Sequence, residues 1–452
     1  MVEISSGLGD GTNAANTYMT NEREVGLPPL QASRKQVWDY YQIEFLPNGY
    51  PGRRTNGELF AHPIYGPYVI SDYTAQYHRT KDQVFLDAAC KVADAAVEQM
   101  TSLGDSLAFV YSQEKTKVAN KNGVFYSGLT QSRYIEVFSK LLLRPGTERF
   151  REPLHRVLTS LTIPIEDNGV ARFTKNGGLI IEEYPSRLPD CTLNGWTTAT
   201  CILMDFAARN DDEQAREIFN QSVRGLEDLM PLYDVPELAN SRYRLTGPAS
   251  LRLAATDTDV EVLDCQVVIP GSGTFAANLA GDPAGEIQKK GTVRVRDGAS
   301  QAVGVSLSRL SWPEPNKILL RVDASKNGQL SVAIGDGEYD PLASWPRAES
   351  YRKVQELPVN KGKNCIEVAI PWACAELVAY PTNFRKTITG RQFNQYHWIH
   401  VDTLAKIVAE TGSHVLRHYH DKWSEYPSMW PKMSAYKDDR LMLERFDAKK
   451  HK

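Results

Sequence analysis

The hydrophobic pattern of this chain changes its period twice, which constrains the fold more than any other feature. From residue 81 onward, apolar residues such as Phe85, Ala88 and Val92 recur at the spacing of one helix face. Near residue 248 the pattern becomes short, β-branched and often alternating, with Gly, Asn, Asp and Pro between the runs. Helical periodicity returns at about residue 393. The sequence therefore predicts a helical scaffold that a β segment interrupts.

The helical part reads as a series of hairpins. Helices are expected at residues 128–143, 147–164, 193–209 and 211–230, and the last opens with a good capping sequence, Asn210-Asp211-Asp212. Short polar turns between such helices favour antiparallel neighbours. A run of these hairpins predicts a mainly α fold with added β structure, an (α/α) barrel or toroid rather than a compact four-helix bundle.

The interrupting segment predicts an antiparallel β-sandwich at residues 248–378. Such an insertion is tolerated where the chain ends of the inserted domain meet at an exposed loop. We expect three parts: an irregular wrap at 1–50, a catalytic (α/α) barrel at 51–247 and 379–452, and the inserted sandwich at 248–378.

Charge and cysteine content exclude several classes of protein. The net charge of -3 gives no global attraction for nucleic acid, so any polyanion must meet a local basic patch. The six cysteines are dispersed without a Cys-x-x-Cys pair, and we expect reduced, mostly buried thiols. No signal-like leader opens the sequence and no apolar run approaches the roughly 20 residues of a membrane helix. We expect a cytoplasmic protein without a membrane partner, although a trimmed chain would read the same.

Motifs for nucleotides and metals are weak. The glycine-rich stretches GLGDG and PGSGTF follow no strand-to-helix pattern, and the sequence has no P-loop. His414, His418 and His420 share an expected helix, but no HExxH occurs, and a surface histidine cluster is commoner than a metal site. We expect no metal and no cofactor.

The remaining candidate site residues are polar groups centred on tyrosines. Their three pieces are Glu182-Glu183-Tyr184, Arg242-Tyr243-Arg244, and Tyr396 with His397 and His400. A phenol has an ordinary pKa near 10, so it suits removal of a weakly acidic carbon proton if arginines stabilise the phenolate. A tyrosine is nevertheless more often a core residue with a polar tip. A second group of tyrosines lies upstream: Tyr65, Tyr68, Tyr73 and Tyr77. They could line a sugar-binding trough, or they could be buried aromatics at helix ends.

These pieces, in this order, resemble the heparan sulfate glucuronyl C5-epimerase family, specifically its carboxy-terminal helical domain. The resemblance rests on EEYP followed by LNG (193–195), LMPLYD (229–234) and YHWIH (396–400). The helix QSRYIEVFSKLL is similar to the family's glutamine-bearing helix, with Gln131 as that glutamine. The order agrees across roughly residues 124–245 and 393–425.

The resemblance implies an (α/α) barrel with a cleft for an acidic, heparosan-like polysaccharide, and a homodimer. The implied reaction removes the C5 proton of a glucuronic acid residue and returns a proton to the opposite face, which gives iduronic acid without a redox cofactor. The implied catalytic groups are Tyr184, Glu183, Tyr243 and Tyr396. The expected binding or orienting groups are Asn194, His397, His400, Gln131, Arg242, Arg244 and Glu182. We expect Tyr184 and Glu183 on one face of the sugar and Tyr396 on the other, with Tyr243 helping to hold or protonate the intermediate.

The chain departs from the family in two places. A β segment interrupts the helical domain, and Tyr243 is followed by Arg-Leu-Thr-Gly, which leaves Arg242 or Arg244 to replace the family's arginine. Two other functions stay open. A polysaccharide lyase begins with the same proton abstraction, and a non-catalytic protein would bind acidic glycans through its β domain.

Overall fold

The computed structural model describes residues 21–112, 124–277, 293–336, 339–343, 350–375, 379 and 381–446. The chain forms two compact units. Unit 1 comprises Met1–Arg187 and Gly195–Gly225, and unit 2 comprises Leu188–Asn194 and Leu226–Lys452. Unit 2 thus contains both the β region and the C-terminal helices. The predicted division into a barrel at 51–247 and 379–452 with a separate insertion stays a prediction.

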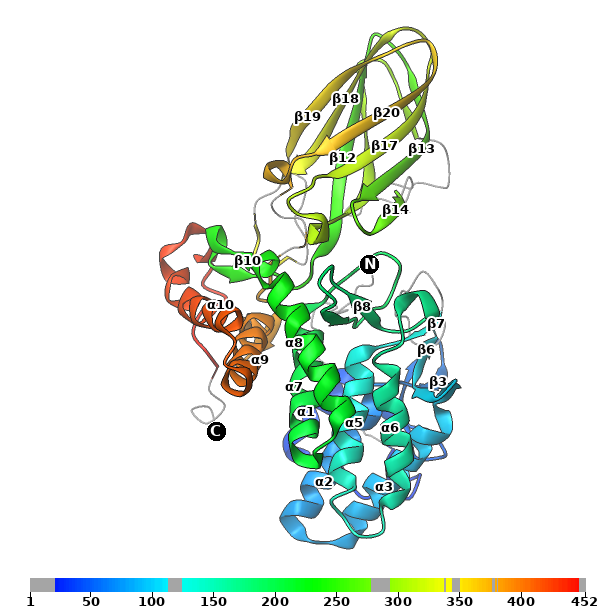
Figure 1. Ribbon diagram of the computed structural model, residues 1–452, viewed down its shortest axis with the longest axis vertical. Coiled ribbons are helices and arrows are strands. Elements are labelled where there is room, and N and C mark those ends of the chain that lie inside the picture. Colours follow the sequence, from blue (N-terminus) through cyan, green and yellow to red (C-terminus); the bar gives the residue numbers. More distant parts are fainter. Residues whose placement is uncertain are drawn as a thin grey trace, which may run out of the picture. The chain divides into compact units, whose positions relative to one another are not determined.

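Unit 1 is built from helical hairpins (Figure 1). Its helices are α1 (Lys35–Tyr41), α2 (Tyr65–Thr80), α3 (Gln83–Gln99), α5 (Gly128–Leu141) and α6 (Arg151–Ser160), with most of α7 (Leu193–Asn210) and the first part of α8 (Glu213–Tyr233). α2 packs on α3 and α5, and α5 packs on α6. The helices expected from periodicity are therefore confirmed, and closure into a barrel stays a prediction.

Local sequence explains where the first hairpin turns. Lys81 ends α2 in the left-handed conformation with φ 61°, and Asp82 caps α3 by accepting a hydrogen bond from the Val84 N–H at 3.1 Å. Side-chain hydrogen bonds join the two helices of a later hairpin, α7 and α8. Ser222 of α8 accepts from the indole of Trp196 at 2.8 Å and lies 2.7 Å from the Thr200 hydroxyl, both on α7.

Short strands connect the helices of unit 1, and periodicity did not predict them. They are β1 (Glu44–Phe45), β2 (Pro51–Thr55), β3 (Glu58–Ala61), β4 (Thr101–Leu103), β5 (Ser106–Ala108), β6 (Val110–Ser112), β7 (Val124–Tyr126), β8 (Ala171–Phe173) and β9 (Leu179–Ile181). Each pairs with its neighbour in an antiparallel sheet of two or three strands. Runs of two to five residues are too short to show the alternation that marks a strand.

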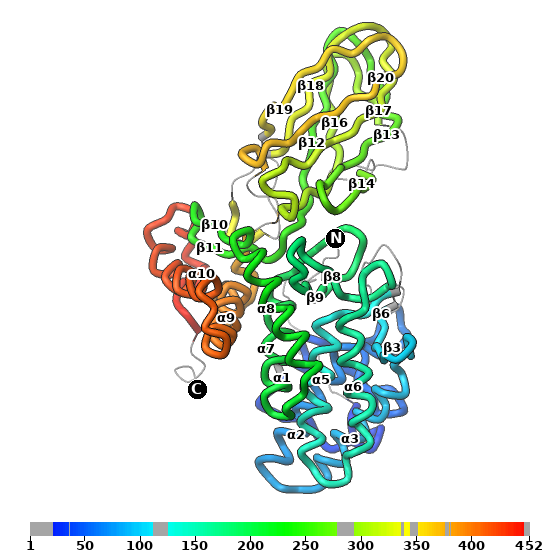
Figure 2. The backbone as a smooth tube through the Cα atoms, viewed as in Figure 1, coloured from blue at the N-terminus to red at the C-terminus, as the bar shows by residue number. Residues whose placement is uncertain are grey.

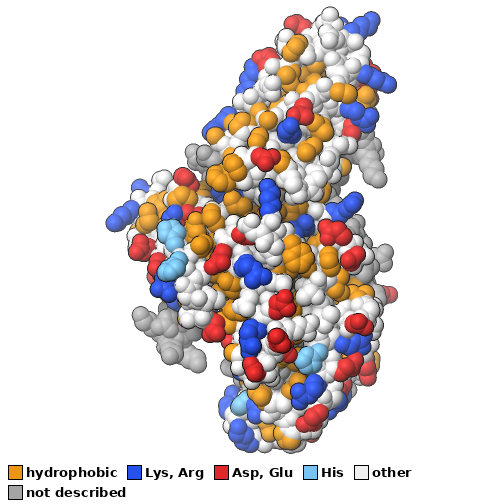
Figure 3. All heavy atoms as spheres, in the orientation of Figure 1, with side chains coloured by type: hydrophobic (Ala, Val, Ile, Leu, Met, Phe, Trp, Pro, Cys, Tyr) orange, Lys and Arg blue, Asp and Glu red, His pale blue; other side chains and the backbone are white. Residues whose placement is uncertain are grey.

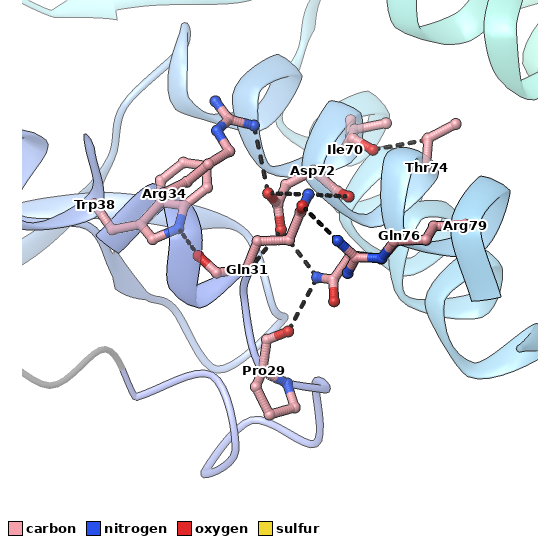
Figure 4. Close-up of polar contacts among 9 residues, drawn as sticks. All are labelled: Pro29, Gln31, Arg34, Trp38, Ile70, Asp72, Thr74, Gln76 and Arg79. Carbon is pink, nitrogen blue, oxygen red and sulfur yellow. Dashed lines mark hydrogen bonds and ion pairs between the residues drawn. The ribbon is translucent and has the colours of Figure 1, made fainter. Parts of the chain in front are cut away.

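Asp72 ties the N-terminal segment to α2 (Figure 4). Its buried carboxylate accepts hydrogen bonds from the backbone N–H and the side-chain amide of Gln31, at 3.1 and 2.8 Å. Gln76 donates to the same carboxylate at 3.0 Å, and Arg34 lies 3.4 Å away. The expected irregular wrap at residues 1–50 is partly wrong, because α1 and β1 lie within it; residues 1–20 lie outside the described part.

In unit 2, the strands described between residues 246 and 370 form two antiparallel sheets (Figure 2). One has the order β16 (Ser300–Ser308), β12 (Thr246–Thr256), β18 (Gly328–Asp336), β19 (Ser350–Val359). The other has the order β14 (Gly273–Ala276), β13 (Val260–Ile269), β17 (Asn316–Ala324), β20 (Gly362–Ile370), with β15 (Val293–Val295) also on β13. Side chains of both sheets, such as Leu253 and Leu320, share one hydrophobic core. The predicted antiparallel β region is therefore present.

The rest of unit 2 consists of helices and small strands. α9 (Gln395–Thr411) packs on α10 (His414–Glu425), and a hairpin of β10 (Asp234–Val235) and β11 (Asn240–Ser241) contacts α9. A small sheet contains β21 (Lys386–Ile388), β22 (Arg391–Phe393) and β23 (Leu441–Met442). Asp234 accepts hydrogen bonds from Trp423 and Tyr426 at 2.9 and 2.8 Å, which fixes the end of α10 to the hairpin.

The structure bears on three expectations about the chain, which concern its cysteines, membrane helices and surface charge. All six cysteines are free, and Cys90, Cys191, Cys201 and Cys265 are buried, as expected. Within the described ranges, no helix has the length and apolar character needed to span a membrane. Acidic and basic side chains are interspersed on the face drawn in Figure 3, in keeping with the small net charge.

Candidate active site

The β8–β9 hairpin places Glu182 inside unit 1. Its side chain is fully buried, and its carboxylate accepts a hydrogen bond from the Arg172 guanidinium at 2.9 Å. The same guanidinium donates to the Ser186 carbonyl at 2.7 Å, and the Glu182 carbonyl accepts from the Gly128 N–H at the start of α5. Glu182 therefore holds the hairpin and the EEYP segment together. Its contact with a substrate stays a prediction.

Glu183 lies against the first turn of α7. A Cβ atom built on Gly195 would be 2.2 Å from Oε2 of Glu183, so this carboxylate occupies the space of the missing side chain. The unpaired N–H groups and the dipole at a helix N-terminus favour the ionised form of a carboxylate. The glycine of LNG is thus explained by the glutamate of EEYP, although 12 positions separate them.

Two phenols of unit 1 lie within electrostatic reach of Glu183. Burial raises the pKa of Tyr68, the Arg133 guanidinium lowers it, and the negative charge of Glu183 raises it again. Burial also holds the pKa of Tyr111 well above its usual range, with Glu183 as a smaller cause in the same direction. Tyr184 follows Glu183 and is half-buried, whereas Glu183 is only 8% exposed.

Gln131 is engaged in the core of unit 1. Its amide donates to the Leu107 carbonyl and to the Ser160 hydroxyl, both at 2.8 Å, and its carbonyl accepts from the Phe109 N–H at 3.0 Å. Both amide hydrogens are used inside the protein. The structure therefore places Gln131 as a link between α5, α6 and the segment around β5, and its binding role stays a prediction.

Unit 2 brings two of the predicted catalytic phenols together. The rings of Tyr243 and Tyr396 have centroids 4.7 Å apart at an interplanar angle of 57°. Both side chains are half-buried, so the pair has a solvent-accessible edge. Tyr396 is the second residue of α9, and Tyr243 lies two residues beyond β11. Two segments more than 150 positions apart therefore meet at one aromatic contact.

Ser241 joins these two segments through both histidines of the YHWIH motif. Nε2 of His397 lies 3.0 Å from the Trp423 carbonyl, which only an N–H can satisfy. Burial lowers the pKa of His397 to about 4, so the ring is neutral at pH 7 and its Nδ1 carries the lone pair. Ser241 then donates to this Nδ1 at 3.1 Å and accepts from Nδ1 of His400 at 2.9 Å.

The same reasoning defines the state of His400. Burial, with a smaller effect of His397, holds its pKa well below the usual value. Its Nε2 is left as a buried acceptor, and no donor among the described residues reaches it. Both histidines are fully buried. They therefore orient the loop that carries Tyr243 and the helix that carries Tyr396.

A second network fixes the start of α9. Asn394 caps the helix by accepting from the His397 N–H at 3.2 Å, and its amide donates to the Thr382 hydroxyl at 3.0 Å. Thr382 in turn donates to the side-chain carbonyl of Asn240 at 2.6 Å, and its N–H donates to the Ser241 carbonyl. Buried polar residues thus connect β11 to the first turn of α9: Asn240, Ser241, Thr382, Asn394 and His397.

Tyr243 is flanked in the sequence by Arg242 and Arg244, and Asn194 comes directly after a residue that bonds the Tyr243 backbone. Arg242 is buried and donates to the Ala379 carbonyl at 3.1 Å. Arg244 is partly exposed and pairs with Asp190 at 3.1 Å. Asn194 follows Leu193, whose N–H donates to the Tyr243 carbonyl at 2.9 Å. The substitution of either arginine for the family's arginine stays a prediction.

The expected residues thus fall into two sets. Unit 1 contains Gln131, Glu182, Glu183 and Tyr184, and unit 2 contains Asn194, Arg242, Tyr243, Arg244, Tyr396, His397 and His400. Sequence reasoning missed Ser241, Asn394 and Thr382, which hold the tyrosine pair. Asn394 directly before the helical pattern of 395–411 is a capping signal that was available. Ser241 and Thr382 gave no such signal, because their partners are distant in the sequence.

Metal-binding side chains do not gather in the described ranges: no group of three or more His, Cys, Asp or Glu residues is arranged to hold an ion there. His414 and His418 are exposed on α10. The stretch PGSGTF overlaps the turn into β14, a strand in an antiparallel sheet, while GLGDG lies outside the described residues.

Comparison with known proteins bears on the middle of the chain. Residues 103–259 match the family model described as D-glucuronyl C5-epimerase C-terminus. An uncharacterised protein of Methanocaldococcus jannaschii is 27% identical over 92 residues, which cover 20% of this chain and 30% of that protein. The chain thus matches less than a third of the length of this relative.

Two solved structures show a partial likeness. The GH76A alpha-1,6-mannanase from Salegentibacter sp. HEL1_6 has a TM-score of 0.32 and 12% identity over 47% of this chain and 53% of that one. Cellobiose 2-epimerase from Bacillus thermoamylovorans B4167 has a TM-score of 0.31 and 13% identity over 41% and 48%. Neither structure defines the fold of this chain.

The matched family region contains EEYP, LNG, LMPLYD and the helix with Gln131, which are four of the segments on which the resemblance rests, and it also contains Tyr243. It also contains Glu183 and Gly195, whose close contact links two of these motifs. The resemblance is confirmed over residues 103–259, which match the model described as D-glucuronyl C5-epimerase C-terminus, so this part of the chain is similar to a carbohydrate epimerase domain.

Proposed function

We propose that the protein is a uronosyl C5-epimerase that converts D-glucuronic acid residues to L-iduronic acid within an acidic, heparosan-like polysaccharide. The observation that carries the proposal is the packing of Tyr243 against Tyr396 at 4.7 Å, with both phenols half-buried. These are two of the tyrosines that the family motifs single out. The buried Ser241–histidine network supports it, because it orients this pair without using a phenol.

The reaction requires a base on one face of the sugar and an acid on the other. The C5–H bond breaks, its proton passes to the base, and its electron pair moves into the carboxyl group. Reprotonation of C5 from the opposite face completes the inversion. A phenol suits both roles, because its conjugate base is strong enough to remove a proton next to a carboxylate. Donors near the sugar carboxylate would stabilise the charge that develops there.

We assign Tyr184 and Glu183 to one face and Tyr396 to the other, with Tyr243 beside Tyr396 to hold or protonate the intermediate. The contact between the Tyr243 and Tyr396 rings supports the placing of these two phenols together. The packing of Glu183 against Gly195 on the first turn of α7 supports a fixed position for this carboxylate. Asn194, Arg242 and Arg244 are proposed to contact the substrate, and the protein is proposed to be a homodimer.

Incubation with heparosan in D2O tests the proposal. NMR is expected to show deuterium at C5 together with iduronate signals. The Tyr396→Phe variant is expected to lose this exchange by at least about a hundredfold, the lower end for one acid–base group. Tyr351→Phe is the matched control, because it removes a half-buried phenol of β19 whose hydroxyl lies 3.0 Å from the Ser250 hydroxyl.

Other outcomes would replace the proposal. Absorbance of unsaturated uronate with falling chain length would identify a polysaccharide lyase. Binding of acidic glycans without exchange or cleavage would identify a non-catalytic glycan-binding protein. Exchange that persists at full rate in Tyr184→Phe and Tyr396→Phe would mean that the site is elsewhere.

A further inference from the structure

Four tyrosines and two arginines of unit 1 form a surface that the assigned site residues do not include. We call it the tyrosine–arginine surface. Its members lie on α1, β2, α2 and α5: Tyr40, Tyr41, Arg53, Tyr65, Tyr68 and Arg133.

Tyr41 is the centre of this surface. Its ring lies 5.1 Å from Tyr40, 5.3 Å from Tyr65 and 5.5 Å from Tyr68, measured between centroids. The Tyr65 hydroxyl donates to the Tyr41 carbonyl at 3.0 Å, and His62 stacks on the Tyr65 ring at 4.0 Å. The tyrosines therefore make one continuous aromatic row.

This row runs from a buried to an exposed end. Tyr65 is 3% exposed, Tyr41 and Tyr68 are half-buried, and Tyr40 is 60% exposed. Two other tyrosines of α2 do not join it. Tyr73 is buried and donates to the Pro28 carbonyl at 2.7 Å, and Tyr77 lies under Arg144. Of the four tyrosines expected to line a trough, only Tyr65 and Tyr68 thus belong to this row, which Tyr40 and Tyr41 complete.

Two arginines lie on elements that pack against α2, Arg53 on β2 and Arg133 on α5. Burial raises the pKa of Tyr65 to about 12, and the exposed guanidinium of Arg53 lowers it. Arg133 lowers the pKa of both Tyr41 and Tyr68, which burial raises. Arg133 shares the carboxylate of Glu136 with Lys140, at 2.8 and 2.6 Å, so these three side chains keep one excess positive charge.

Within unit 1, burial raises the pKa of Tyr68, Arg133 lowers it and Glu183 raises it, so Tyr68 lies within electrostatic reach of both charges. Aromatic faces stack on pyranose rings, and a guanidinium can bind a carboxylate with two parallel hydrogen bonds. In a protein of net charge -3, an acidic polymer needs such a local basic area.

We propose that the tyrosine–arginine surface binds the stretch of glycan next to the reacting uronic acid, with the arginines taking the carboxylate of a neighbouring uronate. This inference rests on the proposed function for its substrate class. It adds a subsite and predicts a dependence on chain length: oligosaccharides long enough to reach Tyr40 and Arg53 bind more tightly than the shortest substrate.

The test compares two double variants of the full protein. Tyr40→Ala with Arg53→Gln removes the exposed end of the surface. Arg252→Gln with Tyr351→Ala is the control, because Arg252 lies over the Tyr351 ring at 3.8 Å and the changes in charge and aromatic area are the same. Thermal melting checks that each variant is folded. Calorimetry measures binding of long and short heparosan oligosaccharides and of carboxyl-reduced heparosan.

The first double variant is expected to bind long heparosan about tenfold more weakly, since loss of a charged hydrogen bond is about 1.4 kcal/mol or more. Its affinity for the shortest oligosaccharide and for carboxyl-reduced polymer is expected to change little. The control variant is expected to bind like the original protein. Unchanged binding of long heparosan by a folded first variant would overturn the subsite, even if C5 exchange is observed. Loss of binding without any C5 exchange would sustain the subsite and overturn the proposed function.

Discussion

Gly195 and Glu183 show how the absence of one side chain shapes the candidate site. The carboxylate of Glu183 fills the position that a Cβ would take, at the start of the helix that follows the EEYP segment. Protein interiors leave little room for even one added methyl group. At the scale of single residues, the space around Glu183 is therefore as important as its charge.

Gly195→Ala is expected to displace the Glu183 carboxylate and to lower C5 exchange at least tenfold, at a stability cost of about 1–3 kcal/mol. The measurement is the exchange rate in D2O beside the thermal melting temperature. Ala208→Gly, at an exposed position of α7, costs about 1 kcal/mol through helix propensity and leaves Glu183 untouched. Equal activity in both variants would contradict the proposed role of Glu183.

The histidine pair predicts a pH dependence of stability. Unfolded histidine takes up a proton near pH 6.5, whereas His397 resists protonation down to about pH 4 in the folded protein. The stability from this histidine is thus present above pH 6.5 and is lost as the pH falls toward 4. Between pH 7 and pH 5 the loss from His397 is about 2 kcal/mol.

Hydrogen–deuterium exchange of α9 peptides at the two pH values measures this loss locally. His400→Asn keeps a side-chain nitrogen for Ser241 and removes one titrating group, so the α9 peptides are expected to depend less on pH. Burial and Arg53 lower the pKa of His62 to about 3. The stability that His62 contributes to unit 1 is therefore also lost as the pH falls. A pH-independent α9 would contradict the assigned neutral state of the pair.

At the scale of elements, the first turn of α9 is set by its cap. Asn394 satisfies the His397 N–H and binds Thr382, so it positions Tyr396 as well as stabilising the helix. The next helix has a comparable cap, because Ser413 accepts from the Leu416 N–H at the start of α10. No proposed catalytic residue lies on α10, which makes the two caps a matched pair.

Asn394→Ala and Ser413→Ala are each expected to cost about 1 kcal/mol of stability. Only Asn394→Ala is expected to reduce C5 exchange, by about tenfold or more, and Asn394→Asp is expected to restore part of it because aspartate also caps. Melting temperatures and exchange rates of the three variants provide the check. A similar activity loss from both alanine variants would show a general effect of stability instead.

At the scale of the whole molecule, the sequence predicted what depends on repeated local patterns. The helices α3, α5, α6, α7 and α8 and the strands β12, β13, β17, β18 and β20 follow from hydrophobic periods that extend over several turns or alternations. The strands of unit 1 are too short for such a signal. The assignment of α9 and α10 to the same unit as the sheets depends on distant contacts, which periodicity does not contain.

The residues of the candidate site likewise divide into those predicted from the sequence and those seen only in the structure. The tyrosines and glutamates were found from motifs, and the structure adds what surrounds them. Ser241, Thr382 and Asn240 act through buried hydrogen bonds to partners up to about 160 positions away, and a single sequence does not reveal such pairs. Arg133 was missed because an arginine on a helix face is usually a surface charge.

The central claim is that the Tyr243–Tyr396 pair transfers a proton at C5 of a uronic acid. Its most direct test is the rate of deuterium uptake at C5 of heparosan in D2O, measured by NMR for the original protein and for Tyr243→Phe, Tyr396→Phe and Tyr351→Phe. We predict uptake in the original protein and in Tyr351→Phe, and losses of about a hundredfold or more in the other two. Uptake at the original rate in Tyr396→Phe, with the protein folded, would contradict the claim.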